Sequence, residues 1–338
     1  MRRSAQLRLP RRAAVALGGA ALALPFIARP ARADVVRWTF YTAAPQGSPG
    51  AEIWQNMASR ISVATLGAVE IAVATAGRVG VDVNAISQAV TAGQLAMGDD
   101  SYYAQFIVAG GVPRLPLLIP NRDAYKRGTK ALRTYLKNAY DARNGVFLAY
   151  TYTPRLRTWS SRSFDSFAGL LNRRIRVTTP EQGEFTRRLG GIPISVPTAD
   201  LLRSLQSGHV DTIYGFANPT ATLFRTLLKY AYAGGPNHMD SVIIAHKPTF
   251  QALPKRTQDL IIQECATAEQ ALINTVFDKE DESIRFLADN GLDLAEQQTV
   301  DVQTMTQRMA VMWDDWTRVR GKEAQDLLFA FRRAMEAE

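Results

Sequence analysis

Arginines on predicted strands are the side chains of this sequence best suited to bind a small anion. Residues 174–177 read Arg-Ile-Arg-Val, and strand alternation points Arg176 away from Ile175 and Val177. Only arginine offers a planar fork of donors that pairs with both oxygens of a carboxylate and stays charged when desolvated. A surface ion pair is the other interpretation, and the pattern taken alone favours it.

A second basic group lies upstream of this strand. Arg155, Arg157 and Arg162 surround the segment Thr-Trp-Ser-Ser at 158–161. Alternate residues of a strand share a face, so Arg155 and Arg157 are both candidates to face one anion. A solvated basic cluster is the alternative interpretation.

Residues suited to catalysis do not gather. Cys265 is the only cysteine, so no intramolecular disulfide forms, and its apolar helical setting indicates a buried small hydrophobe. Phosphate-loop, His-Glu-x-x-His and Gly-x-Ser-x-Gly motifs are absent. Ser160 or Ser161 with His209 is a formal nucleophile–base pair for an exported α/β hydrolase, without support from spacing. We therefore expect no catalytic residue, metal site or cofactor, and keep such an enzyme as the alternative.

Alternating strands and helices must position these residues. Strand patterns lie at 35–41, 69–74, 94–98, 147–152, 174–177, 193–196, 209–214, 241–246 and 292–294. Helical patterns lie at 51–66, 84–92, 122–141, 181–189, 199–207, 218–230, 255–289, 302–320 and 322–335. Short loops between them predict two α/β units with largely parallel sheets. Residues 255–289 contain no Pro or Gly and predict a helix of roughly 50 Å that runs across both units.

The first 33 residues have the pattern of an export signal. A basic start, an apolar run at 13–27 and Ala-Arg-Ala at 31–33 predict cleavage after Ala33 and release into the periplasm. The twin arginines at 11–12 leave both the Sec and the Tat route open, and the apolar run is short for a permanent anchor. Seven arginines and no acid lie there, so the formal charge falls from +9 to +2 on cleavage. We therefore expect no nucleic-acid partner.

An ordered series of motifs resembles the substrate-binding subunit of tripartite ATP-independent periplasmic (TRAP) transporters, the DctP-like family. The series comprises Gly-Leu at 169–170, Arg-Ile-Arg-Val at 174–177, Leu-Gly-Gly-Ile-Pro at 189–193, Val-Asp at 210–211 and Asn-Pro at 218–219. The similarity covers nearly all of 35–290. One departure is Ala217, which stands where the family has Glu before Asn-Pro.

The resemblance implies a two-lobed α/β solute-binding fold with crossing hinge strands and a long helix spanning both lobes. We expect lobe I in 34–155 plus about 242–270. Lobe II is expected in 156–241 plus about 271–338, with a helical C-terminal extension. A small organic anion, usually a carboxylate, is then expected in the interlobe cleft of a monomeric receptor. TRAP permease membrane subunits are the implied partner, and a sensor kinase is an alternative recipient of the signal.

The resemblance also assigns residues to the site. Arg176 matches the family's central carboxylate contact, and Arg157 is the better match to a second family arginine, with Arg155 as competitor. Asn218 remains a candidate although its loop is altered.

Further candidates rest on position. Tyr214 and Phe216 are expected near the cleft, with core packing as the alternative. Three residues of the other lobe follow the carboxyl ends of strands, where open α/β sheets bind ligands: Tyr41, Ser101 and Tyr102.

Overall fold

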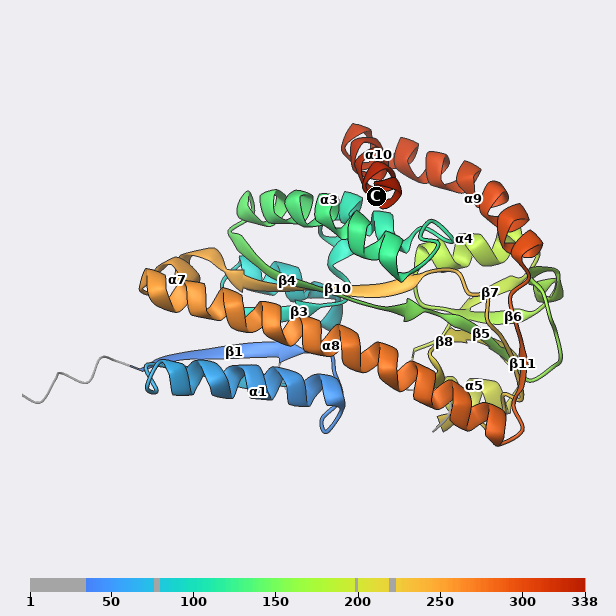
Figure 1. Ribbon diagram of the computed structural model, residues 1–338, viewed down its shortest axis with the longest axis horizontal. Helices are drawn as coiled ribbons and strands as arrows, with labels where there is room; N and C mark the ends of the chain where they lie inside the picture. The colour runs from blue at the N-terminus through green and yellow to red at the C-terminus, as the bar shows by residue number, and fades with distance from the viewer. Residues whose placement is uncertain (1–34, 76–79, 198–199, 219–222, 338) are drawn as a thin grey trace, which may run out of the picture. The chain divides into compact units, whose positions relative to one another are not determined.

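Two β-sheets organise the chain, which confirms the predicted α/β class (Figure 1). The computed structural model describes residues 35–75, 80–197, 200–218 and 223–337. The predicted export signal and cleavage site lie outside these residues.

The first sheet has the strand order β2-β1-β3-β10-β4. Its strands are β1 (Val36–Thr42), β2 (Val69–Ala74), β3 (Met97–Asp100), β4 (Gly145–Arg155) and β10 (His238–His246). Strand β1 runs parallel to β2 and β3, whereas β10 runs antiparallel to β3 and β4. The helices of this half are α1 (Pro49–Ala64), α2 (Ile86–Thr91), α3 (Arg122–Asp141) and α7 (Lys247–Gln251).

The second sheet has the strand order β11-β9-β5-β8-β6-β7. Its strands are β5 (Arg157–Ser160), β6 (Arg174–Val177), β7 (Ile192–Ser195), β8 (Thr212–Gly215), β9 (Tyr230–Tyr232) and β11 (Asp293–Ala295). Strand β6 is parallel to β7 and β8, and β5 is antiparallel to β8 and β9. Helices α4 (Pro180–Arg188) and α5 (Leu201–Gln206) belong to this half.

Helix starts follow from local sequence. The side chain of Ser48 accepts a hydrogen bond from Ala51 N, and Pro49 occupies the first turn of α1. Thr179 and Pro180 repeat this arrangement at the start of α4, where Thr179 accepts from Gln182 N. A hydroxyl at the cap satisfies a helix N–H that has no partner within the helix, and proline fits the first turn because it lacks an N–H.

The chain crosses between the sheets on adjacent strands. Only Leu156 separates β4 of the first sheet from β5 of the second, and residues 233–237 lead back from β9 to β10. Leu156 N donates to Asn237 O at 2.9 Å, so the two crossings are hydrogen-bonded to each other. Each strand that enters from the other sheet is antiparallel to its neighbours: β10 to β3 and β4, and β5 to β8 and β9. The sheets are therefore mixed rather than largely parallel.

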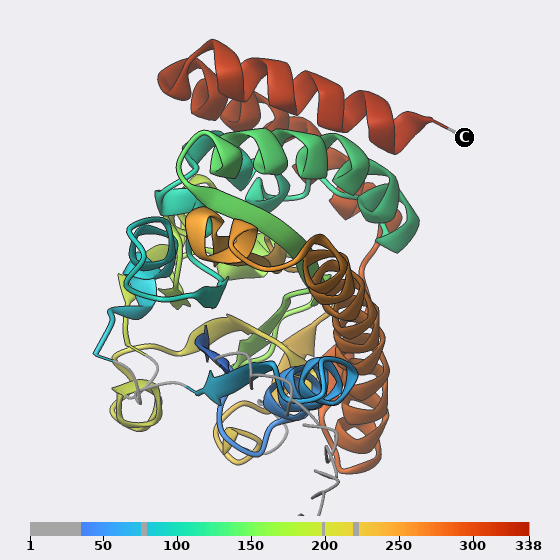
Figure 2. The ribbon, with the colours of Figure 1, turned by 90° about the vertical axis from the view of Figure 1, so that its left-hand side faces the viewer.

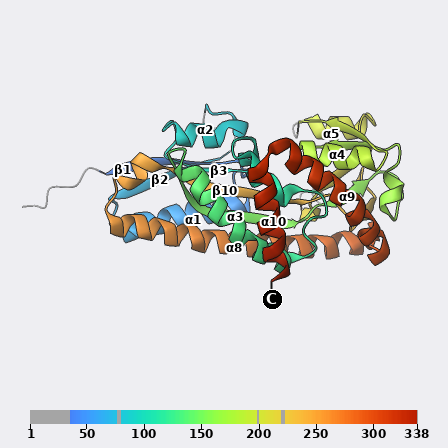
Figure 3. The same ribbon diagram turned by 90° about the horizontal axis from the view of Figure 1, so that it is seen from above.

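Helix α8 (Lys255–Asp289) has the bounds that the sequence predicts and packs on both sheets. Ile261 and Cys265 lie in the apolar cluster of the first sheet, and Leu287 lies in that of the second. Figure 3 shows the helix running alongside elements of both sheets. The Cys265 side chain is fully buried beside Met57 of α1, with 3.7 Å between the two sulfur atoms.

Of the C-terminal helices α9 (Thr299–Arg320) and α10 (Lys322–Glu336), α10 packs over α3 (Figure 2). Phe331 of α10 is fully buried, and a Cβ on Gly128 of α3 would lie only 2.7 Å from its ring. Helix α9 donates two indole hydrogen bonds, from Trp313 to Pro116 O at 2.8 Å and from Trp316 to Glu181 at 2.9 Å.

One predicted element is wrong in its second half. The sequence predicts a helix over 218–230, but residues 224–227 form turns and Tyr230 begins strand β9. Pairing with β5 and β11 on either side stabilises the extended Tyr-Ala-Tyr segment, which outweighs its local preference.

Candidate functional site

Arg157 and Arg176 project from the same face of the second sheet. Arg157 opens β5 and pairs with Gly215, while Arg176 in β6 pairs with Ile213. Gly215 and Ile213 are two residues apart on β8, which lies between β5 and β6, so their side-chain directions agree. The register therefore places both guanidinium groups on one face, at the edge where β8 ends and β5 begins.

Arg176 is half-buried and lies near the end of the first sheet's strand β3. Its Nε donates to Val196 O at 3.1 Å. Burial lowers the pKa of Arg176, and the nearby Tyr102 opposes this shift. Tyr102 follows β3 of the first half. Two predicted site residues from different halves, Tyr102 and Arg176, therefore lie near each other.

Arg157 faces Glu280 of α8, which the sequence did not single out. Arg157 Nε lies 3.9 Å from Glu280 Oε1, and Arg157 Nη1 is buried without a hydrogen-bond partner in the described part of the chain. Glu280 also accepts from Ala217 N at 2.8 Å and from Asn218 N at 3.4 Å. Burial raises the pKa of Glu280. One buried carboxylate thus fixes both Arg157 and the altered loop that carries Asn218.

Arg155 lies in a different sheet from Arg157. Its guanidinium donates to the carbonyls of Ile119 and Pro120, just before α3, and burial lowers its pKa to about 10. The two arginines are two residues apart, but the crossing at Leu156 puts them in β4 and β5. The structure therefore does not bring Arg155 onto the face that carries Arg157 and Arg176.

A cavity of about 280 Å³ opens between the two halves, and among the described residues neither Arg157 nor Arg176 forms part of its wall. Its wall includes Phe216 and Asn218 from the second half, Asp99 from β3, and Glu280 from α8. The rest of its wall comprises Ala44, Ser48, Pro49, Gly50, Trp54, Thr153, Pro154, Leu272, Thr275, Val276 and Lys279. Arg157 adjoins this cavity through Glu280.

The remaining predicted residues take different positions. Tyr41 is buried in β1 beside Gly98, and burial, with the charges of Asp82 and Asp99, raises its pKa. Tyr214 lies on the opposite face of β8 from the two arginines. Its hydroxyl lies 2.9 Å from that of Thr186.

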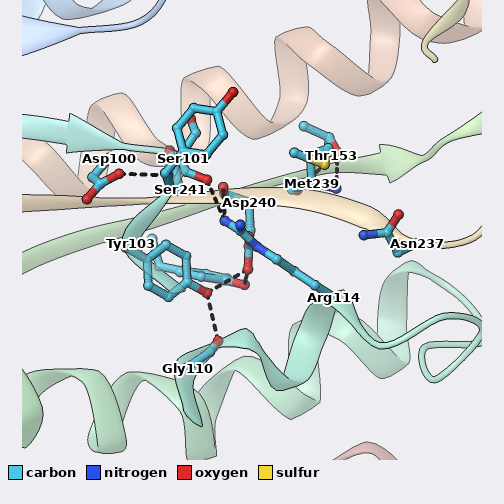
Figure 4. Close-up of polar contacts among 12 residues, drawn as sticks. Asp100, Ser101, Tyr103, Gly110, Arg114, Thr153, Asn237, Met239, Asp240 and Ser241 are labelled. Carbon is cyan, nitrogen blue, oxygen red and sulfur yellow. Dashed lines mark hydrogen bonds and ion pairs between the residues drawn. The ribbon is translucent and has the colours of Figure 1, made fainter. Parts of the chain in front are cut away.

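A buried ion pair holds the segment that carries Ser101 and Tyr102 (Figure 4). Arg114 Nε donates to Asp240 Oδ1 at 2.6 Å, and its Nη2 donates to Ser101 O at 2.6 Å. Tyr103 donates to Asp240 Oδ2 at 2.7 Å. This network anchors the backbone beside Tyr102, and no local pattern around Arg114 signals it.

The formal catalytic pair of the sequence is not assembled. Ser160 Oγ is buried and contacts Thr212, Asp211 O and Arg173. The described residues contain no hydrogen bond between Ser160 or Ser161 and His209. They also contain no group of three metal-ligand side chains and no helix apolar and long enough to cross a membrane.

Comparison with known protein families identifies the family of this chain. The family model DctP, described as bacterial extracellular solute-binding protein family 7, matches residues 40–318. The chain belongs to this family. The resemblance to TRAP solute receptors is thereby confirmed, and so is the assignment to a family of solute-binding proteins. The comparison with curated proteins found no match.

Solved structures of extracytoplasmic and TRAP solute receptors share the fold. Two extracytoplasmic solute receptors of Bordetella pertussis, both described as binding pyroglutamic acid, superpose with TM-scores of 0.78 and 0.80 at 22% and 19% identity. Each alignment covers 88% of this chain and 100% of the other. A receptor of Roseobacter denitrificans with bound β-D-glucuronate gives a TM-score of 0.77 at 16% identity, over 88% and 99% of the chains. The predicted two-lobed α/β fold is confirmed.

Proposed function

We propose that this protein binds a small organic acid between its two halves and that Arg176 holds the carboxylate of that acid. The observation that carries the proposal is the register that sets Arg157 and Arg176 on one face beside β8. Two guanidinium groups at one sheet edge attract an anion, and a half-buried arginine binds a carboxylate more strongly than an exposed one does. Asn218 and Phe216, which line the adjoining cavity, supply a polar and an aromatic contact.

The ligands of similar receptors support an acid of this size. Pyroglutamate, glucuronate and orotic acid are named for three receptors with this fold, and each carries a carboxylate. Identities of 16–22% do not transfer any one of them to this chain.

The proposal includes export and delivery. The signal at 1–33 is cleaved after Ala33, and the mature monomer acts in the periplasm, reached by the Sec or Tat route. It passes its ligand to the membrane subunits of a TRAP permease. Lobe I comprises 34–155 plus about 242–270, and lobe II comprises 156–241 plus about 271–338. The protein acts by binding and not by catalysis.

Replacement of Arg176 tests the carboxylate contact. Arg176→Ala is expected to weaken binding by about 2–5 kcal/mol, roughly 30- to 5,000-fold in Kd, because the bound carboxylate loses its charged partner in a partly dry site. Isothermal titration with a panel of small carboxylic acids, including lactam, hydroxy, sugar and aromatic acids, measures the change.

Arg174 supplies the matched control. It lies on the same strand two residues earlier, is exposed and pairs with Asp211 at 3.9 Å. Arg174→Ala should keep the affinity of the wild type for the acid that binds. Equal affinity of Arg176→Ala and wild type would remove Arg176 from the site.

A further inference from the structure

Glu280 of α8 places a buried acid beside the sheet edge that carries Arg157 and Arg176. Its side chain is only 5% exposed. Both of its carboxyl oxygens lie 2.8 Å from Ala217 N, and Oε2 also lies 3.4 Å from Asn218 N. These two residues follow the end of β8, the strand between β5 and β6. The acid therefore lies against the loop at the edge where both arginines project.

The groups around Glu280 fit an ionised carboxylate. A carboxylate only accepts hydrogen bonds, whereas a protonated carboxyl group also has a proton to donate. Among the described residues, the polar groups that contact its oxygens are all donors: two main-chain N–H groups and Arg157 Nε. Burial raises the pKa of Glu280, and Asp281 adds to this effect, whereas the N–H groups of Ala217 and Asn218 and the charge of Arg157 lower it. The hydrogen-bonding pattern thus assigns a negative charge to Glu280.

This negative charge balances the positive charge of Arg157 within the protein. Arg157 Nε lies 3.9 Å from Glu280 Oε1, and the two side chains are 22% and 5% exposed. Opposite charges this close, with little water around them, cancel most of each other's field at longer range. An incoming anion therefore meets a pair of nearly zero net charge at Arg157. The face that carries the two arginines is less positive by one charge than its guanidinium groups alone would make it.

Other charged groups around this face do not restore the balanced charge. Lys279 is the cation in the described wall of the adjoining cavity, and it pairs with Glu282 at 2.7 Å. Asp99 in the same wall can only add negative charge. Arg155 donates to main-chain carbonyl groups just before α3. A second carboxylate on the bound acid would therefore lose its water and meet charge pairs in return.

We propose that the Arg157–Glu280 pair makes the receptor select acids with a single carboxylate over dicarboxylic acids of the same shape. The inference rests on the proposed function, in which Arg176 holds that carboxylate, and narrows its ligand class to monocarboxylic acids. The selection arises because a second carboxylate is brought close to the negative charge of Glu280. Like charges placed together in a binding site lower affinity for the wrong ligand.

Dicarboxylic acids and their half-amides test this on the wild-type protein. Succinate, glutarate and the aromatic terephthalate each have a half-amide of nearly the same shape with one negative charge less. Isothermal titration should give the half-amide a Kd that is lower by about tenfold or more, and the tightest acid of the wider panel should carry one carboxylate. A dicarboxylate that binds as tightly as its half-amide, or that is the tightest acid of the panel, would overturn the inference and leave the proposed function in place.

The variant Glu280→Gln removes the charge and keeps an acceptor for the loop. Its carbonyl oxygen still accepts from Ala217 N, while Arg157 loses its opposite charge. The preference for the half-amide should fall below about threefold or reverse, because Arg157 now attracts a second carboxylate. Asp289→Asn, at an exposed position of the same helix, is the control and should keep the wild-type preference. A folded Glu280→Gln protein with the wild-type preference would also overturn the inference.

Removal of both charges separates charge balance from a structural effect. The double variant Arg157→Gln/Glu280→Gln has the same net charge at this edge as the wild type, so its preference for the half-amide should return to about tenfold. If Glu280 acted only by holding the loop, the double variant would instead behave like Glu280→Gln, and that result would overturn the inference. If the folded wild type binds no acid of the pairs or of the wider panel, the proposed function fails and this inference fails with it.

Discussion

His238 is a buried histidine that folding keeps neutral. Only 6% of it is exposed, and its Nδ1 lies 2.8 Å from Thr153 O. Burial lowers the pKa of His238 to about 3, and the positive charge of Arg155 adds to this effect. In the unfolded chain the same imidazole takes up a proton near pH 6.5. Its contribution to stability is therefore complete above pH 6.5 and is lost as the pH falls toward 3.

Acid should destabilise the protein through this residue. At pH 5, protonation of unfolded His238 is expected to cost about 2 kcal/mol, because each pH unit below 6.5 is worth about 1.4 kcal/mol. Urea unfolding of wild type and His238→Gln at pH 7.5 and 5 measures the difference, and the Gln variant should lose about 2 kcal/mol less. His209→Gln at an exposed site controls for the loss of a histidine. Identical pH dependence in His238→Gln and wild type would contradict the assignment.

The sequence predicts the positions of some site residues but not of others. Strand alternation around Arg176 predicts its direction correctly, because that information is local. Glu280, Arg114 and Asp99 become notable only through partners far away in the chain. Glu280, for example, lies on a helix whose pattern does not distinguish it, and only folding brings it to Arg157.

The two chain crossings between the sheets approach each other so closely that no side chain fits between their backbones at Gly235. Gly235 lies in the return from β9 to β10, and a Cβ there would lie 1.7 Å from Leu156 O in the other crossing. Two backbones approach closely at this point, and the clash is with main-chain atoms that cannot rotate away. The sequence Gly-Gly-Pro at 234–236 predicts only a turn, since the neighbour of Gly235 is about 80 positions earlier in the chain.

Gly235→Ala should therefore destabilise the fold by about 3 kcal/mol or more, as expected when overpacking forces a backbone shift. Thermal or urea unfolding measures the loss. Gly183→Ala in α4 is the matched control, because its Cβ would meet only the end of Arg187 at 3.7 Å. That substitution should be neutral or slightly stabilising, since alanine is the better helix former. A Gly235→Ala protein as stable as wild type would show that the two crossings are not tightly apposed.

Predictability at the scale of elements follows the strength of local signals. The long helix is predicted to the residue because Pro254, an uninterrupted run and Gly291 mark both ends. Strand β9 is missed because three residues carry no periodicity, and its extended form depends on two neighbouring strands.

At the scale of the whole molecule, helices contact both halves. Helix α8 contributes to the apolar clusters of both sheets. Helix α9 donates one indole hydrogen bond to Pro116, in the segment before α3, and another to Glu181 of α4. The family's ordered motifs predict the two-lobed fold and the spanning helix, whereas the packing of α10 over α3 is not encoded in those motifs.

The rate at which a reagent labels the Cys265 thiol reports how often helices α1 and α8 separate. The thiol of α8 is fully buried against Met57 of α1, so a reagent reaches it only when these helices separate. Burial also raises the pKa of the thiol, which lowers the fraction of reactive thiolate. Labelling under native conditions should be at least about a thousandfold slower than in concentrated urea, the ratio expected for openings of about 4 kcal/mol or more. An acid at 100 times its Kd should slow the reaction by about a further hundredfold if α1 and α8 separate only when the binding site is lost as well. Mass spectrometry of timed samples follows both rates, and native labelling as fast as in urea would mean that this helix pair opens by itself.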